Sequence, residues 1–133
     1  MNQAQIQPVK TAAADLSRTQ ETETLLALVL ESLDDDQAQD VVSIPLEGKS
    51  SIADHMIVAS GRSSRQVTAI AQKLAERIKH SGLAMPRIEG LPAADWVVVD
   101  AGDVVVHVFR PEVRGFYNLE RMWAFGDTAA GTA

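Results

Sequence analysis

Cysteine is absent from this chain of 133 residues. Its absence excludes disulfide bonds, thiolate metal sites and cysteine nucleophiles. The sequence also lacks an apolar run of the roughly 20 residues that would span a bilayer, and its first residues contain no apolar segment typical of a signal peptide. We therefore expect a cytoplasmic protein that makes no contact with a membrane.

Basic residues are too few to balance the acidic ones. The chain has 12 Lys and Arg against 18 Asp and Glu, which leaves a net charge of −6. Proteins that hold bare nucleic acid neutralise its phosphates with Lys and Arg, so this balance predicts little direct contact with nucleic acid. A basic protein is the partner that such a charge favours.

The length and the apolar content predict one folded domain. Apolar residues make up 46% of the chain and charged residues 23%, both close to the averages of globular proteins. The two ends lack periodicity, so we expect flexible tails at residues 1–18 and 126–133 around a single domain at 19–125.

Hydrophobic periodicity predicts the order α-β-β-α-β-β-β-α. The expected elements are a helix from Thr19 to Asp34, strands at 41–46 and 52–59, a helix opened by Ser63 and ended by Gly82, strands at 87–89, 96–100 and 104–109, and a closing helix from Pro111 to Met122. Ser63 and Gln66 have the spacing of a capping box ahead of a clear amphipathic pattern. One crossover helix with hairpins on either side predicts an α/β (α+β) fold, with a mixed sheet of about five strands and helices packed on it.

Two patterns in the sequence are typical of enzyme chemistry. The segment 61–64 leaves a strand and opens a helix, where backbone N–H groups can hold a phosphate, but an ordinary N-cap at Ser63 accounts for the pattern and is the interpretation we favour. Asp100 and Asp103 bracket a turn, and His107 follows four residues later on the same strand face, roughly 13 Å away at about 3.3 Å per residue. That spacing disfavours a metal site, so we expect no metal and no cofactor, and keep a nucleotide-handling enzyme with Ser63, Ser64, Asp100 and Asp103 as the alternative.

Alternation along the last two strands separates an apolar face from a mixed one. If the apolar faces meet the helices, the less covered side of the sheet carries Trp96, Asp100, Val105, His107 and Phe109. A tryptophan there is typical of a protein interface, but it is equally suited to close a sheet edge or a second layer of core. These residues alone leave both interpretations open.

Several stretches resemble the ribosomal silencing factor family, also called RsfS or Iojap-like. They follow the order of that family between Thr24 and Phe125, at residues 48–54, 59–67, 88–90, 94–109, 111–114 and 116–123. The most specific of them combines Asp95-Trp96, Asp100-x-Gly102-Asp103 and His107-Val108-Phe109.

The resemblance implies a binding protein rather than an enzyme. The family has a nucleotidyltransferase-like core, but the Gly-Ser and Asp-x-Asp elements of active transferases are not matched here. A family member is expected to bind the large ribosomal subunit through its protein fourteen and to block joining of the small subunit, which represses translation. Apart from the resemblance, self-association as a homodimer through the Trp96 side of the sheet is kept as a third alternative, compatible with either function. The expected partner-binding residues are Trp96, Asp100, Asp103, His107, Phe109 and Glu89.

Overall fold

The computed structural model describes residues 2–46 and 53–117. The elements follow the predicted order: α1 (Asn2–Asp35), β1 (Gln39–Pro45), β2 (His55–Ser60), α2 (Ser64–Ser81), β3 (Arg87–Glu89), β4 (Trp96–Asp100), β5 (Val104–Phe109) and α3 (Pro111–Tyr117). The last three predicted strands have the bounds expected from the sequence. The expected C-terminal tail and the part of the closing helix after Tyr117 lie outside the described residues.

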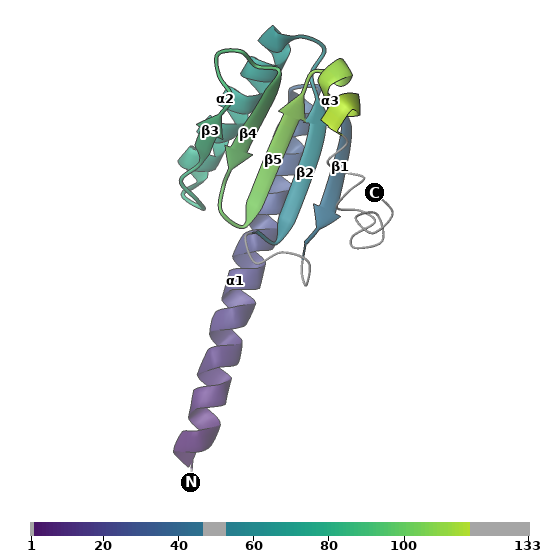
Figure 1. Cartoon of the computed structure of the whole chain (residues 1–133). Coiled ribbons are helices and arrows are strands. Elements are labelled where there is room, and N and C mark those ends of the chain that lie inside the picture. The colour runs from purple at the N-terminus through teal and green to yellow at the C-terminus, as the bar shows by residue number, and fades with distance from the viewer. Residues whose placement is uncertain (1, 47–52, 118–133) are drawn as a thin grey trace, which may run out of the picture.

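The five strands form one mixed sheet in the order β1-β2-β5-β4-β3 (Figure 1). The central pair, β2 and β5, is parallel, and each of the other neighbouring pairs is antiparallel. A parallel pair needs a crossover connection, which here contains α2, while short connections suffice for the antiparallel pairs. The predicted α/β (α+β) fold with a mixed five-stranded sheet is therefore confirmed.

Helix α2 begins and ends at the predicted capping residues. The Ser63 side chain accepts a hydrogen bond from Gln66 N at 3.1 Å, and Gln66 Oε1 accepts one from Arg62 N at 2.6 Å. At the other end Gly82 adopts a left-handed φ of 76° and donates its N–H to Lys79 O. The Ser63 side chain thus satisfies one of the orphan N–H groups of the first turn, that of Gln66.

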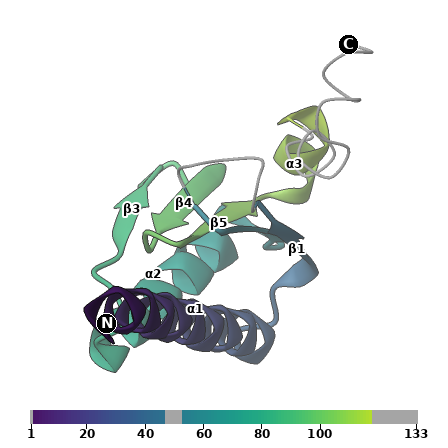
Figure 2. The same ribbon diagram turned by 90° about the horizontal axis from the view of Figure 1, so that it is seen from below.

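Helices α1 and α2 cover one face of the sheet, and α3 lies on the other side (Figure 2). The layer between the two long helices and the sheet is apolar and almost inaccessible to water. Its largest members with no more than 1% exposure include Val29, Leu33, Ile57, Val67, Ile70, Leu74, Ile78, Val97, Val99, Val104, Val106 and Val108. Each such side chain contributes about 1.5–3 kcal/mol by burial, which makes this layer the main core of the fold.

Helix α1 is longer than the sequence predicted. It begins at Asn2 rather than near Thr19, so the backbone of residues 2–18 is helical where we expected a flexible tail. Figure 1 shows that this first part extends beyond the sheet. A helical segment beyond the sheet needs no apolar stripe, and its many Ala and Gln residues are good helix formers. None of the helices in the described ranges has both the length and the apolar character needed to cross a membrane.

Candidate functional site

The strand register defines the face of β3, β4 and β5 that points away from α1 and α2. Directly opposed residues share a face, and the pairs Arg87–Asp100, Glu89–Val98, Trp96–Phe109, Val98–His107 and Asp100–Val105 are all opposed. We call this set the Trp96 face; its members are Arg87, Glu89, Trp96, Val98, Asp100, Val105, His107 and Phe109. The side of the sheet that the alternation pattern assigned to Trp96 is therefore the side on which the structure places it.

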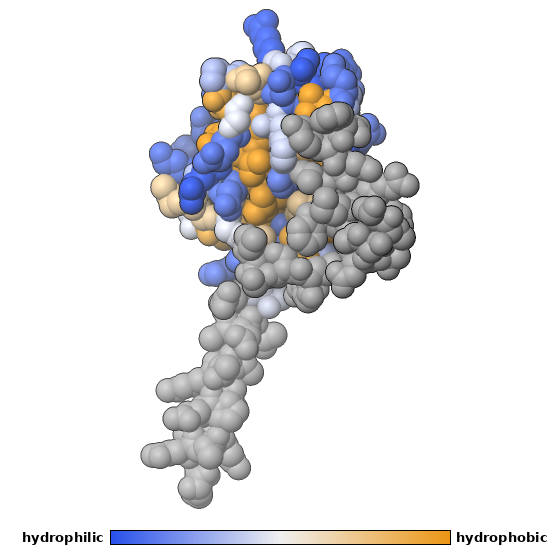
Figure 3. Space-filling model, in the orientation of Figure 1, coloured by the Kyte–Doolittle hydropathy of each residue, from blue (hydrophilic) through white to orange (hydrophobic). Residues whose placement is uncertain are grey.

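Hydrophobic residues gather along the middle of this face (Figure 3). They lie over β4 and β5, and hydrophilic residues border them on the β3 side. Val98 and Val105 are half-buried, whereas Val97 and Val99 on the other face of β4 are completely buried. The Trp96 face thus combines apolar side chains that remain partly accessible with a polar border, which is typical of a protein interface.

Trp96, His107 and Phe109 form an aromatic cluster on this face. Trp96 Nε1 donates a hydrogen bond to His107 Nδ1 at 3.0 Å, and the two rings are tilted with centroids 5.9 Å apart. Phe109 stacks on Trp96 at 5.1 Å and on His107 at 6.3 Å. Offset ring pairs at such distances stabilise each other beyond simple burial. Among the contacts of the indole are therefore a hydrogen bond to His107 and a stacked Phe109 ring.

Burial keeps the His107 imidazole uncharged near neutral pH. Removal of the ring from water lowers the pKa of His107 from 6.5 to about 4. A neutral imidazole has one nitrogen that accepts and one that donates. Because Nδ1 accepts from the indole, the proton of His107 lies on Nε2.

Of the six predicted partner-binding residues, five lie on the Trp96 face and differ in exposure. Trp96 and His107 are half-buried, Glu89 is exposed, and Phe109 is only 1% exposed. Phe109 therefore supports Trp96 from below rather than offering a contact of its own. It belongs to a second, smaller apolar cluster on this side of the sheet, with Ile44, Leu46, Ala53, Met56 and Val58.

The two aspartates of the turn between β4 and β5 have separate roles. Asp100 Oδ1 accepts a hydrogen bond from Gly102 N at 2.9 Å, a local contact that is common for an aspartate beside a glycine turn. Asp103 Oδ2 instead accepts from the hydroxyl of Thr22 on α1 at 3.1 Å. Asp103 is therefore tied to the helix layer and is not a member of the Trp96 face, and its part in partner binding stays a prediction.

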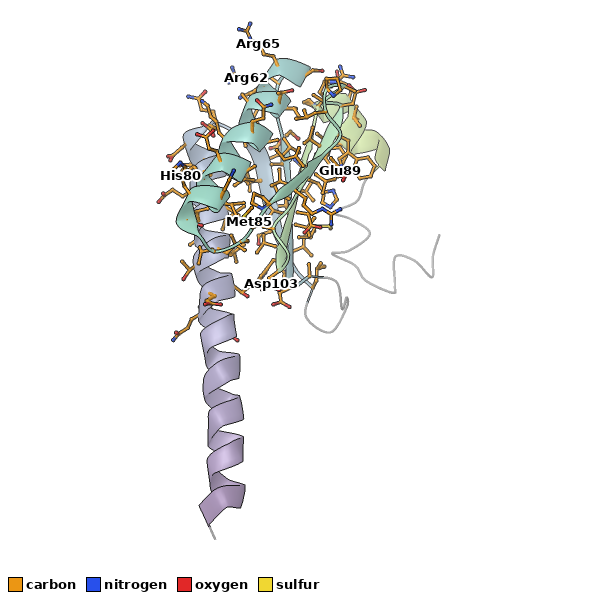
Figure 4. The ribbon with its side chains drawn as sticks, turned by 90° about the vertical axis from the view of Figure 1, so that its left-hand side faces the viewer. Arg62, Arg65, His80, Met85, Glu89 and Asp103 are labelled. Carbon is orange, nitrogen blue, oxygen red and sulfur yellow. The ribbon has the colours of Figure 1, made fainter. Side chains whose placement is uncertain are left out.

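The residues of the alternative enzyme site do not converge. Arg62 and Arg65, which flank Ser63 and Ser64, lie at one end of the sheet, and Asp103 lies at the opposite end (Figure 4). Among the residues that the structure describes, no three His, Asp or Glu side chains are grouped so that they could hold a metal ion. The described geometry offers no shared pocket in which those serines and aspartates could act together.

Comparison with known proteins assigns the chain to a family. A sequence model described as "Ribosomal silencing factor during starvation" matches residues 19–132. The chain belongs to the ribosomal silencing factor family. It is similar to the ribosomal silencing factor of Zymomonas mobilis, with 70% identity over 105 residues that cover 79% of each chain.

Two further relatives are a solved bacterial structure and a mouse protein. A crystal structure of a Chromobacterium violaceum protein resembles it with a TM-score of 0.73 and 38% identity, covering 76% of this chain and 84% of that one. The mouse protein named "Mitochondrial assembly of ribosomal large subunit protein 1" is 31% identical over 112 residues, which are 80% of this chain and 49% of that protein.

Sequence reasoning missed two features on or next to the Trp96 face. Arg87 lies on this face, which follows from alternation along β3 once the register of β3 and β4 is known. Arg110, directly after β5, pairs with Asp95 at 2.8 Å and with Glu112 at 3.8 Å. The sequence signal for that pair was present, since Asp95 directly precedes β4 and Arg110 directly follows its antiparallel neighbour β5.

Proposed function

We propose that this silencing factor binds the large ribosomal subunit through the Trp96 face and contacts protein fourteen of that subunit. The observation that carries the proposal is the accessible apolar strip around a Trp96 side chain fixed by His107 and Phe109. Tryptophan is enriched among the residues that dominate binding energy at interfaces. The name of the mouse relative, which refers to assembly of the large ribosomal subunit, supports the same partner.

Charge favours a basic ribosomal protein over bare ribosomal RNA. The chain has a net charge of −6, and Glu89 and Asp100 outnumber Arg87 on the proposed contact face. Complementary fields raise the rate of association with a basic partner, while phosphate groups are repelled. The acidic balance therefore supports contact with a protein of the subunit.

The proposed effect on translation is steric. A specific interface of standard size covers about 800 Å² on each partner, roughly a tenth of the 8385 Å² surface of this chain. The rest of the domain then stands on the face where the small subunit would join. Occupancy alone prevents joining, and no catalytic step is required.

Sedimentation with isolated large subunits tests the contact. We expect the native chain to sediment with the subunits and Trp96→Ala to bind about tenfold more weakly or worse, because the substitution removes the anchor. Met85→Ala is the matched control, since Met85 is 75% exposed but lies on the connection between α2 and β3. Equal affinity of the native chain and a folded Trp96→Ala variant, judged by circular dichroism, would overturn the proposed face.

Light scattering from mixed subunits tests the consequence. The native chain is expected to reduce association of small with large subunits in proportion to its occupancy, and Trp96→Ala to restore association. Unhindered association at a concentration that saturates the large subunit would refute the steric mechanism while leaving the binding result intact.

A further inference from the structure

The Trp96 indole is held by a side chain of the neighbouring strand. Residues 96 and 107 are not directly opposed: Trp96 pairs with Phe109, and His107 pairs with Val98. They are diagonal neighbours on one face, a separation that long and aromatic side chains can bridge. The 3.0 Å bond from Nε1 to Nδ1 bridges it here and fixes the direction of the indole across the sheet.

This bond has two consequences for a tryptophan that must be covered by a partner. Immobilising a side chain on binding normally costs conformational entropy, and a side chain already fixed in the free protein avoids much of that cost. An indole N–H that has an internal acceptor also needs none from the partner, so its burial leaves no donor unsatisfied. Both effects favour binding without adding any contact to the partner.

We propose that His107 is a positioning residue, which holds the Trp96 indole in the orientation that the large ribosomal subunit binds. The inference rests on the proposed function and extends it, because it assigns to His107 an action through Trp96 rather than a contact of its own. Phe109 completes the arrangement from the buried side by stacking on both rings.

The surroundings keep the His107 acceptor available. The imidazole is neutral near pH 7 because burial holds its pKa at about 4. The charged residues that share its face are Asp100 on β4 and Arg87 and Glu89 on β3, whereas its opposed neighbour on β2 is the apolar Val58. Another charged side chain near this side of the sheet is Arg114 on α3, which donates a hydrogen bond to Ser60 Oγ at 2.9 Å.

Two substitutions separate the acceptor from the ring. His107→Asn keeps an acceptor, because the amide oxygen of Asn can take the place of Nδ1, but it removes the ring. His107→Phe keeps a ring that can stack on Phe109 but has no acceptor. His107→Val, which suits a β-strand, serves as a second variant without an acceptor if His107→Phe does not fold.

The indole N–H resonance of Trp96 reports the bond directly in the free protein. The chain has two tryptophans, Trp96 and Trp123, so Trp96→Phe identifies the signal. In His107→Phe we expect this signal to move upfield and its hydrogen to exchange faster with water, and in His107→Asn to remain near its native position. A signal that is unchanged in His107→Phe would show that His107 does not hold the indole, and would overturn the inference.

Sedimentation with isolated large subunits then measures the effect on binding. We expect His107→Phe to bind about threefold to tenfold more weakly, the range that one net hydrogen bond provides, and His107→Asn to bind within about twofold of the native chain. If His107→Phe shifts the indole signal but binds as tightly as the native chain, the positioning role is refuted and the proposed function stands. If the native chain itself does not bind, the proposed function fails first, and the positioning role fails with it.

Discussion

The two faces of β4 and β5 are built from alternate residues of the same strands, yet they are held in different ways. On the side of α1 and α2 every residue is valine with no exposed surface: Val97, Val99, Val104, Val106 and Val108. On the Trp96 face the side chains are mixed, and all except Phe109 keep some contact with water. The covered face is held by apolar packing alone, whereas on the partly accessible face a hydrogen bond and ring contacts fix Trp96, His107 and Phe109.

Gly90, in the connection between β3 and β4, packs closely against the backbone of Trp96 and Val97. Its φ is +106°, and a Cβ built there would collide with the carbonyl oxygen of Trp96 and lie 3.1 Å from Val97 Cα. We expect Gly90→Ala to cost about 4 kcal/mol or more in the free energy of unfolding in urea, since backbone atoms cannot yield as side chains can.

Gly102→Ala is the matched control for that substitution. Gly102 also has a positive φ, +86°, but a Cβ added to it would meet no atom of the described residues within 4 Å. It should therefore lose only about 1 kcal/mol, from backbone strain alone. Equal losses at the two glycines would show that the collision at Trp96 is relieved at little cost.

Acid should weaken the Trp96 face through His107. The folded pKa of His107 is about 4 and its ordinary value is 6.5, so the unfolded chain takes up the proton first as pH falls. The neutral, buried state of His107 therefore adds about 3 kcal/mol to the free energy of unfolding above pH 6.5. This stabilisation is lost as the pH falls from 6.5 to 4. The charged neighbours on the same face are Asp100, Glu89 and Arg87.

Urea unfolding of the native chain and of His107→Asn isolates that contribution from other titrating groups. Between pH 7 and pH 4.5 the native chain should lose more free energy of unfolding than His107→Asn loses. A difference that is constant over this range would mean that His107 titrates alike in the folded and unfolded chains.

Two adjacent valines of β4 compare the faces by the same substitution. Val99 is completely buried under the helices, and Val98 is half-buried on the Trp96 face. Val99→Ala should cost about 2.5 kcal/mol, because it leaves a cavity in the main core, and Val98→Ala below about 1 kcal/mol. The loss of β-propensity is common to both variants, so urea unfolding reports the difference in packing. A reversed order would place the main core on the Trp96 side.

The fold was predictable wherever one strand or helix carried its own signal. The valine runs of β4 and β5 gave both their bounds and their faces, and Ser63 and Gln66 gave the start of α2. The first half of α1 carried no such signal, since a helix beyond the sheet needs no apolar stripe.

The candidate site was predictable as a set of residues but not as a set of contacts. Alternation placed Trp96 and His107 on one side, yet their hydrogen bond depends on the register between β4 and β5, which the sequence did not specify. The contact of Asp103 with Thr22 was not predictable, because Thr22 lies 81 residues away on a helix whose docking position only the structure reveals. Phe109 was expected at the surface, and its burial depends on packing from other segments.

The apolar layer between the helices and the sheet contains a buried hydroxyl, which the comparison of the two faces would not lead one to expect. Ser32 on α1 is completely buried, and its hydroxyl has no hydrogen-bond partner among the described residues. Ser32→Ala should stabilise the chain by about 1 kcal/mol in urea unfolding, because it removes an unsatisfied group and alanine favours a helix. Thr22→Val is the matched control on the same helix, since the Thr22 hydroxyl is paired with Asp103. It should destabilise by about 1 kcal/mol. Destabilisation by Ser32→Ala would mean that the Ser32 hydroxyl is satisfied in solution, and that this layer is not the purely apolar counterpart of the Trp96 face.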